Sequence, residues 1–235
     1  NRQGNAGDIN IRVADSFVIN NTGIISDSHD TGDVGNINIS ANSLQIEDSG
    51  VYSRGIDTRK PGDINIQVAG SFVMSKDSSI STESYGTGNA GKINISANTL
   101  EMDYSRFRSA TGENATGNAG EINLQVANRM DLRNHSSVDT DVFGKLGHAG
   151  NTSIVADTIQ LDTKSRINAD STTGQGGNIG LQIGNLLLLR RKSTISTNAG
   201  RAKQPGDGGN ITINTPNGFI VAVRGENSDI SADAY

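Results

Sequence analysis

The stretch Gly91-Lys92-Ile93-Asn94-Ile95-Ser96-Ala97 decides the fold, because variants of it occur eight times along the 235 residues. Each copy begins at an anchor glycine, and successive anchors are 28, 27, 29, 29, 30, 27 and 32 residues apart; they are Gly7, Gly35, Gly62, Gly91, Gly120, Gly150, Gly177 and Gly209. A period of roughly 20 to 50 residues is typical of stacked units, none of which can bury its apolar face alone. The sequence therefore predicts one solenoid over residues 1–235.

Three short alternating segments follow each anchor glycine, and each is typical of a half-buried strand. The first places apolar residues at every second position, as in Ile93, Ile95 and Ala97. The second contributes an apolar pair; these pairs are Phe17/Ile19, Leu44/Ile46, Phe72/Met74, Leu100/Met102, Met130/Leu132, Ile159/Leu161, Leu187/Leu189 and Phe219/Val221. The third pairs a large residue with a small one, as in Ile80/Thr82. No helical periodicity occurs, so the expected fold is an all-β parallel β-helix of about eight coils of 27–32 residues, with three short strands per coil.

Length variation concentrates in one corner of the predicted coil. From the small residue of the third strand to the next anchor glycine the spacing is 9, 9, 9, 11, 10, 8 and 12 residues. The longest or most irregular of these segments are Asp27–Val34, Ala110–Ala119, Asp141–Ala149 and Asn198–Gly208. Because insertions in repeat proteins gather on the face that is most often used for binding, we expect any site to lie at this variable corner.

Outward positions of the first strand form a column of asparagines, namely Asn10, Asn38, Asn65, Asn94 and Asn123. Stacked side-chain amides can hydrogen-bond along such a column, so we interpret it as a structural ladder rather than a sugar-binding strip. Charges of opposite sign also fall on neighbouring coils. Asp63, Lys92 and Glu121 follow three consecutive anchors, and Arg108 is placed beside Asp139; both sets predict exposed ion pairs.

Composition excludes several function classes. The net charge of −5 gives no electrostatic argument for nucleic acid. The chain has no cysteine, which excludes disulfides and thiolate metal sites. Its longest apolar run, Leu186–Leu189, is far shorter than the roughly 20 residues of a membrane helix, so no membrane span is expected. The chain starts without Met and stops after a third strand, so we expect the natural protein to extend beyond it.

Candidate chemical groups are few. His29, His135 and His148 fall at different points of their coils, which argues against a metal site. A polysaccharide-active enzyme would need clustered carboxylates with a basic residue. The nearest candidate set is Asp139, Asp141 and Asp170 with Arg108 and His135. Only Asp139 and Arg108 share a register position, and they can satisfy each other, so we expect no catalytic, cofactor-binding or metal residues.

A local basic segment, Arg190-Arg191-Lys192, follows an unusually apolar strand, and Arg201 and Lys203 come one corner later. We interpret it as a solvated turn rather than a binding patch. Ice or crystal-surface binding needs flat ranks of threonine, and the outward column of the third strand does not supply them: it reads Ile25, Tyr52, Ser81, Arg108, Asp139, Asn168, Ser196 and Ser231.

The repeat resembles the shaft repeats of filamentous-haemagglutinin-like exoproteins of the two-partner secretion type, above all the large cyanobacterial members. The resemblance is carried by segments such as Asn89–Ala97 and Gly218–Val223 and extends over the whole chain. It implies a right-handed β-helix, export through an outer-membrane transporter, and display or release at the cell surface. The motifs of the family's N-terminal secretion domain are absent from this chain.

From the residues and this resemblance together, we expect a structural or adhesive shaft or passenger segment of a secreted, cell-surface exoprotein that is not an enzyme and needs no cofactor. Its expected partners are the transporter and a carbohydrate or other host or cell-surface ligand. The alternative is a polysaccharide-active β-helix enzyme, a lyase or a hydrolase.

Overall fold

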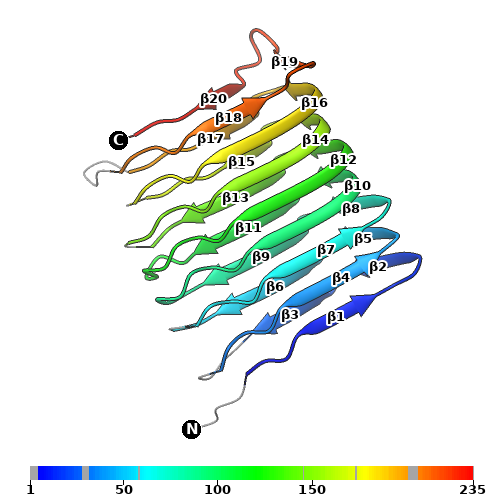
Figure 1. The fold of residues 1–235 in the computed structure, drawn as a ribbon, viewed down its shortest axis with the longest axis vertical. Helices are drawn as coiled ribbons and strands as arrows, with labels where there is room; N and C mark the ends of the chain where they lie inside the picture. Colours follow the sequence, from blue (N-terminus) through cyan, green and yellow to red (C-terminus); the bar gives the residue numbers. More distant parts are fainter. Residues whose placement is uncertain are drawn as a thin grey trace.

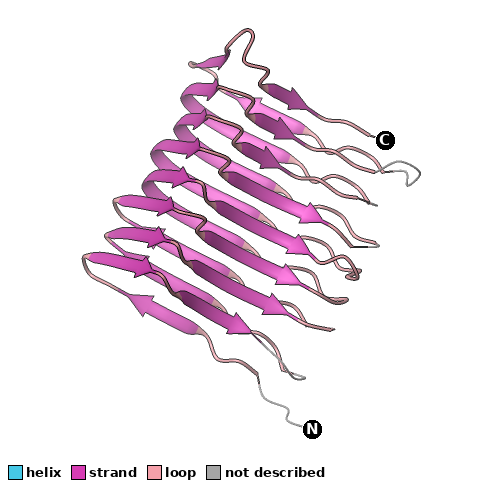
Figure 2. Ribbon diagram, turned by 180° about the vertical axis from the view of Figure 1, so that it is seen from behind, coloured by secondary structure: helices cyan, strands magenta, loops and turns pink. Residues whose placement is uncertain are grey.

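The computed structural model describes residues 5–27, 32–57, 59–144, 146–172, 174–200 and 206–234. These residues form parallel strands that stack coil on coil from the N-terminal end to the C-terminal end (Figure 1). Figure 2 shows the same stack from behind, with strands and loops and no helix in the part of the chain that the structure describes. The expected parallel β-helix is confirmed.

The first strand of the coil is separate in coils one to three and in coil eight, where it forms β1 (Ile9–Arg12), β4 (Ile37–Ala41), β7 (Ile64–Val68) and β18 (Ile211–Asn214). The second strand is separate in the same coils, as β2 (Ser16–Asn20), β5 (Ser43–Glu47), β8 (Ser71–Ser75) and β19 (Phe219–Ala222). In coils four to seven the two merge into long strands, β10 (Ile93–Asp103), β12 (Ile122–Arg133), β14 (Thr152–Leu161) and β16 (Ile179–Leu189). Register shifts in these long strands, such as the one between Ala97 and Thr99, lie where the other coils turn from the first strand to the second. All these strands belong to one sheet.

The third strands form a second, separate sheet. They are β3 (Gly23–Asp27), β6 (Gly50–Gly55), β9 (Ser79–Ser84), β11 (Arg106–Thr111), β13 (Ser137–Val142), β15 (Arg166–Asn168), β17 (Thr194–Ser196) and β20 (Asp229–Ser231). Within the described residues the strand path from β1 to β18 has eight rungs, which seven turns of the chain connect. The prediction of about eight coils therefore counts rungs, and the number of complete turns is slightly smaller.

The core is the column of inward apolar residues, stacked as the alternation predicts. Ile93 lies between Ile64 and Ile122, and Phe107 lies between Ile80 and Val138. All six side chains are fully buried. The packed column extends through the middle coils, and the flanking residues Ile9, Phe17 and Ile211 of the end coils are only partly buried.

The second-strand pair expected in the last coil is wrong by one position. Ile220, not Phe219, aligns with the buried Leu187, and Ala222 aligns with Leu189. The corner between β18 and β19 is one residue longer than the corresponding corner in β16, and a one-residue slip moves each side chain to the other face of a strand. All four residues of β19 are exposed, Phe219 to 69% and Ile220 to 48%.

The anchor glycines are required by close stacking of the backbone. A Cβ atom on Gly120 would overlap the carbonyl oxygen of Gly91, and a Cβ on Gly150 would overlap that of Gly120. The small hydroxyl residues of the third strand satisfy these carbonyls from inside the coil. Thr82 donates to the Gly91 oxygen at 2.7 Å, and Thr140 donates to the Gly150 oxygen at 2.7 Å. The narrow corner is thus both tightly packed and hydrogen-bonded.

Candidate functional site

A groove of about 510 Å³ opens at the variable corner of coils five to seven. It lies where β13 and β15 end and the irregular connections begin, along the loop-bearing edge seen at the left in Figure 1 and at the right in Figure 2. The lining residues are Asp141, Val142, Phe143, Arg166, Asn168, Asp170, Ser171, Thr172, Asn198 and Gly200. This volume is in the range of sites for small molecules, and its location is the corner where a site was expected.

Of the candidate carboxylates, Asp139 is held in a buried ion pair, but its partner is not the expected one. Arg166, on the next coil, donates to the two carboxylate oxygens of Asp139 at 2.9 and 3.0 Å, and Ser137 donates a third hydrogen bond at 2.6 Å. The predicted pair of Arg108 with Asp139 is wrong, although the two are register neighbours. Arg108 instead lies 3.3 Å from the Glu83 carboxylate and 5.1 Å from the ring centroid of Phe143.

Asp141 is the unusual group of the groove. Only 8% of it is exposed, and its Oδ1 atom is buried with no hydrogen-bond partner. Burial, followed by repulsion from Asp139 and Asp170, raises the pKa of Asp141 to about 8, although Arg108 and Arg166 oppose this shift. At neutral pH the group is therefore mostly a neutral acid. Burial removes the water that would otherwise hydrogen-bond to Asp141 Oδ1, and no protein group takes its place.

The remaining polar groups of the groove are largely occupied. Ser171 donates to the Gly147 carbonyl at 3.2 Å, and Thr172 donates to the Val142 carbonyl at 3.1 Å. The Asp170 carboxylate accepts the backbone N–H of Asn198 at 2.8 Å. The side-chain Oδ1 of Asn198, in contrast, is buried without a partner. Two oxygen acceptors in one groove are therefore unsatisfied.

The histidines do not join this groove. His135 lies before β13, at the opposite end of that strand from Asp141, with its ring 6.4 Å from Tyr104. Nδ1 of His148 accepts the backbone N–H of Gln175 at 3.1 Å. His29, Arg201 and Lys203 lie outside the described residues. Among the residues that are described, no three histidine, cysteine, aspartate or glutamate side chains form a group that could hold a metal ion.

Comparison with known proteins adds no identity. No family model, curated protein or solved structure matches the chain. The described part of the chain also contains no helix with the length and apolar character needed to cross a bilayer. Function must therefore be argued from the residues themselves.

The asparagine column is a structural ladder, as predicted. Asn38, Asn65, Asn94 and Asn123 each donate to the amide oxygen of the asparagine one coil before, at 2.9, 2.9, 2.9 and 3.0 Å. These amides therefore link successive coils, which is the structural role expected of the column. The exposed ion pair of Lys92 with Glu121 is also confirmed, at 2.8 Å.

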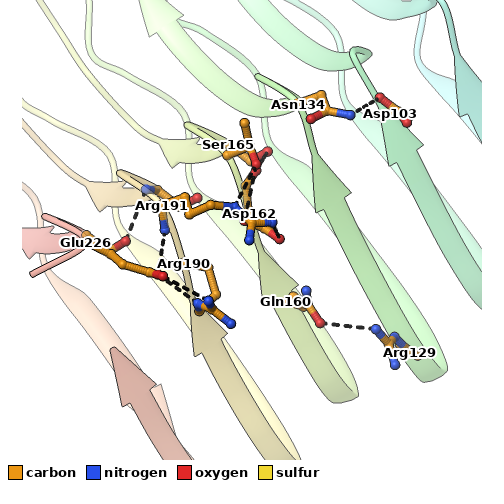
Figure 3. A network of polar contacts seen from close by, with 12 residues as sticks. Asp103, Arg129, Asn134, Gln160, Asp162, Ser165, Arg190, Arg191 and Glu226 are labelled. Atoms are coloured by element: carbon orange, nitrogen blue, oxygen red, sulfur yellow. Dashed lines mark hydrogen bonds and ion pairs between the residues drawn. The ribbon is translucent and has the colours of Figure 1, made fainter. Parts of the chain in front are cut away.

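Two residues of the basic segment that follows β16, Arg190 and Arg191, pair with carboxylates of neighbouring coils (Figure 3). Arg190 donates to both carboxylate oxygens of Glu226 at 2.7 and 2.8 Å, and Arg191 binds the carboxylate of Asp162. The hydrogen bond from the Arg190 side chain, followed by that from the backbone N–H of Arg191 at 2.9 Å, lowers the pKa of Glu226 to about 2. The arginines therefore join successive coils and do not form an open anionic-ligand site.

Proposed function

We propose that this chain is a shaft or passenger segment of a secreted cell-surface exoprotein, and that its contacts with other molecules are made at the variable corner. The proposal rests on a contrast between two parts of the coil. In the ladders, outward polar side chains hydrogen-bond to one another, whereas the groove contains acceptors that have no partner. A stack whose coils contact only their neighbours is suited to act as a spacer.

Export through an outer-membrane transporter of the two-partner type belongs to the same proposal. It is supported by the resemblance of the repeats and by the lack of cysteine, which leaves no disulfide to form before translocation. The test is to fuse the chain behind a secretion domain of that type, with its transporter, and to measure protease accessibility on intact cells. Retention of the fusion inside the cell would contradict this part of the proposal.

The spacer role is tested by deleting residues 63–120, which removes two whole coils. The remaining coils keep their phase, so we expect a folded rod shortened by about 10 Å, since parallel strands lie roughly 4.8 Å apart. Small-angle scattering measures the length and circular dichroism the fold. The matched control removes residues 92–105, half a coil, and should disrupt the stack. If the two-coil deletion unfolds the protein, the spacer proposal fails.

A second candidate function is cleavage of polysaccharides, because one carboxyl with a raised pKa next to other carboxylates is a common acid–base arrangement. Incubation with acidic and neutral glycans, with and without calcium, distinguishes the two functions. New chain ends that disappear in Asp141→Asn would favour the enzyme. The absence of new ends with every glycan would favour the shaft.

A further inference from the structure

A second, shallower groove crosses the first strands of the coils, on a different face from the variable corner. Three hollows of about 430, 390 and 420 Å³ follow one another along the stack, and the last two share Val126, Ala127 and Val155. Their floor is the fourth residue of each first strand, which the register stacks into one column; from coil one to coil eight it reads Arg12, Ser40, Gln67, Ser96, Gln125, Val155, Gln182 and Asn214. We call this surface the axial groove.

The middle of the axial groove differs from the asparagine ladder beside it. In the ladder an amide stands on every coil, and Asn94 donates to Asn65 one coil away at 2.9 Å. In coils three to seven of the axial groove glutamine stands only on alternate coils, and the shorter side chain of Ser96 or Val155 lies between. Since coils are about 4.8 Å apart, the backbones of successive glutamines are about 10 Å apart.

The three glutamines keep hydrogen-bonding groups free. Their side chains are exposed, and those of Gln67 and Gln125 have no hydrogen-bond partner in the part of the chain that the structure describes. Gln182 accepts from Asn214 at 2.7 Å, which leaves its own N–H groups unpaired. Each amide carries a donor and an acceptor side by side. The floor therefore presents unpaired amides at a regular interval of two coils.

The charge and the shape of the axial groove indicate which class of ligand suits it. Among the described residues that line it, only Arg12, at its N-terminal end, and Asp157 are charged. Between them the floor consists of amide, hydroxyl and aliphatic groups. A neutral ligand rich in hydroxyls can exchange hydrogen bonds with these amides without burying a charge. Because the groove extends over several coils, the matching ligand is an elongated chain.

We propose that the axial groove binds a neutral β-1,4-linked glycan chain, which lies along the stack and hydrogen-bonds to Gln67, Gln125 and Gln182. In such a chain one sugar ring extends by about the separation of two coils, and every second ring presents the same hydroxyls on the same side. The intervening rings pass over the short side chains of Ser96 and Val155. This inference goes beyond the proposed function, because it assigns a contact surface away from the variable corner.

An extended polypeptide fits this groove less well. Its side chains recur on one face about every 6.6 Å, which matches neither one coil nor two. It also cannot pair as an added strand, because the groove runs across the strands and the backbone groups of the inner coils already bind neighbouring coils. An α-1,4-linked glucan curls into a helix, so its rings do not stay in step with the coils.

The test is calorimetric titration of the chain with cellohexaose and with maltohexaose, which has the same rings joined by α-linkages. We expect cellohexaose to bind with a Kd on the order of 1 mM and maltohexaose to bind at least tenfold more weakly. Cellobiose reaches only one glutamine and should also be at least tenfold weaker. The affinity should level off at about five rings, the length that spans Gln67 to Gln182.

Variants locate the ligand on the groove floor. Gln125→Ala removes the central amide and should weaken cellohexaose about fivefold. Gln45→Ala changes an exposed glutamine of a second strand, outside the groove lining, and is the matched control. The double variant Ser96→Gln with Val155→Gln places an amide on every coil, so that the amides can bind one another as the asparagines do. It should weaken binding even though it adds amides, and circular dichroism checks that each variant is folded.

A second probe separates two sources of the same chain. Tighter binding of chitohexaose than of cellohexaose would support an N-acetylated glycan, and equal or weaker binding would support a glucan. The proposal is overturned if maltohexaose or an uncharged serine–glycine peptide binds as tightly as the β-linked chains, or if neither β-linked hexasaccharide binds at millimolar concentration. It is also overturned if folded Gln125→Ala binds as well as Gln45→Ala, or if the double variant binds more tightly than the parent. The secretion and coil-deletion tests are separate from these outcomes.

Discussion

The turn between the second and third strands and the variable corner are two solutions to the same problem, that of reversing the chain once per coil. The turn differs by only one residue among the first seven coils, and the corner by four. In the turn, several polar groups find partners one coil away, as Ser105 N–H does at Ser136 Oγ, although Ser193 Oγ and Arg133 Nε are buried without a partner. At the corner, Asp141, Asn198 and Thr111 each keep a buried atom unpaired. The more uniform turn therefore repeats its hydrogen bonds from coil to coil more often than the corner does.

Left-handed residues absorb the small difference in turn length. Shorter turns have one such residue, as at Asp48 and Tyr104, and longer turns have two in succession, as at Asn134 and His135. A serine follows in both cases and accepts a backbone N–H from the preceding coil: Ser105 N–H donates to Ser136 Oγ at 3.2 Å. The extra residue is therefore accommodated before the serine, which keeps its place at the start of the third strand.

The largest expected effect tests the packed glycine corner. Gly120→Ala introduces a Cβ that overlaps the Gly91 carbonyl, and we expect it to lower the free energy of unfolding by about 4 kcal/mol or more. Urea denaturation followed by circular dichroism measures this. The matched control is Gly180→Ala, where no atom lies within 4 Å of the new Cβ. Equal stability of the two variants would show that close stacking does not explain the glycine column.

The next effect is at the groove and depends on pH. The folded chain keeps the Asp141 proton up to about pH 8, whereas the ordinary pKa is 3.8, so the free energy of unfolding attributable to this group falls as the pH rises through that window. Asp141→Asn cannot ionise and should be more stable than the parent by several kcal/mol at pH 8, since each unit of pKa difference corresponds to about 1.4 kcal/mol, with little difference at pH 4. Thermal melts across this range check it; a constant difference at all pH values would contradict it.

A smaller change in stability is expected at two buried hydroxyl groups, one in the turn and one at the corner. Ser136 donates to the Arg133 carbonyl at 2.6 Å and accepts from Ser105, so Ser136→Ala should cost about 1–2 kcal/mol. Thr111, at the end of β11, has a buried hydroxyl without a partner, and Thr111→Val should be neutral or stabilising. Parallel urea denaturation of both variants gives the answer. If Thr111→Val lost more unfolding free energy than Ser136→Ala, the expected difference between the turn and the corner would be wrong.

The smallest effect is at the exposed ion pairs. Lys92 and Glu121 are 46% and 42% exposed, and solvent and salt screen their attraction. Lys92→Ala should therefore change the free energy of unfolding by less than about 0.5 kcal/mol. The exposed Ser96→Ala on the same strand is the reference. A loss above 1 kcal/mol that disappears in high salt would show that surface charge contributes more than the ladders suggest.

Periodicity was sufficient to predict the coil, because alternation of Ile93, Ile95 and Ala97 determines which faces are buried whatever the loops do. It failed in the last coil, where the longer corner before Phe219 shifts the register. It also missed a second glycine column, three residues before most of the anchors, as at Gly117 and Gly147. A Cβ on Gly147 would overlap the Gly117 carbonyl. The repeated Gly-x-x-Gly spacing was the available signal.

Loop variation predicts where the groove lies, but it does not predict which side chains pair with one another there. The sequence groups Asp141 and Asp170 with Asp139, but nothing in it indicates that Arg166 rather than Arg108 pairs with Asp139. That choice depends on side-chain reach and burial across three coils, since Arg108 is directly opposite Asp139 in the sheet register, whereas Arg166 is opposite Ser137 and reaches Asp139 diagonally. The raised pKa of Asp141 likewise follows from burial, which alternation alone does not predict at the end of a strand.

The hydrogen bonds between coils point along the length of the stack, and this orientation determines how it responds to a pull on its two ends. The load falls on the rungs in series, so the outermost coil separates first while the others remain intact. Each coil of 27–32 residues then adds about 100 Å of extended chain. A tether built in this way yields in steps, dissipating force at its ends before its middle is disturbed.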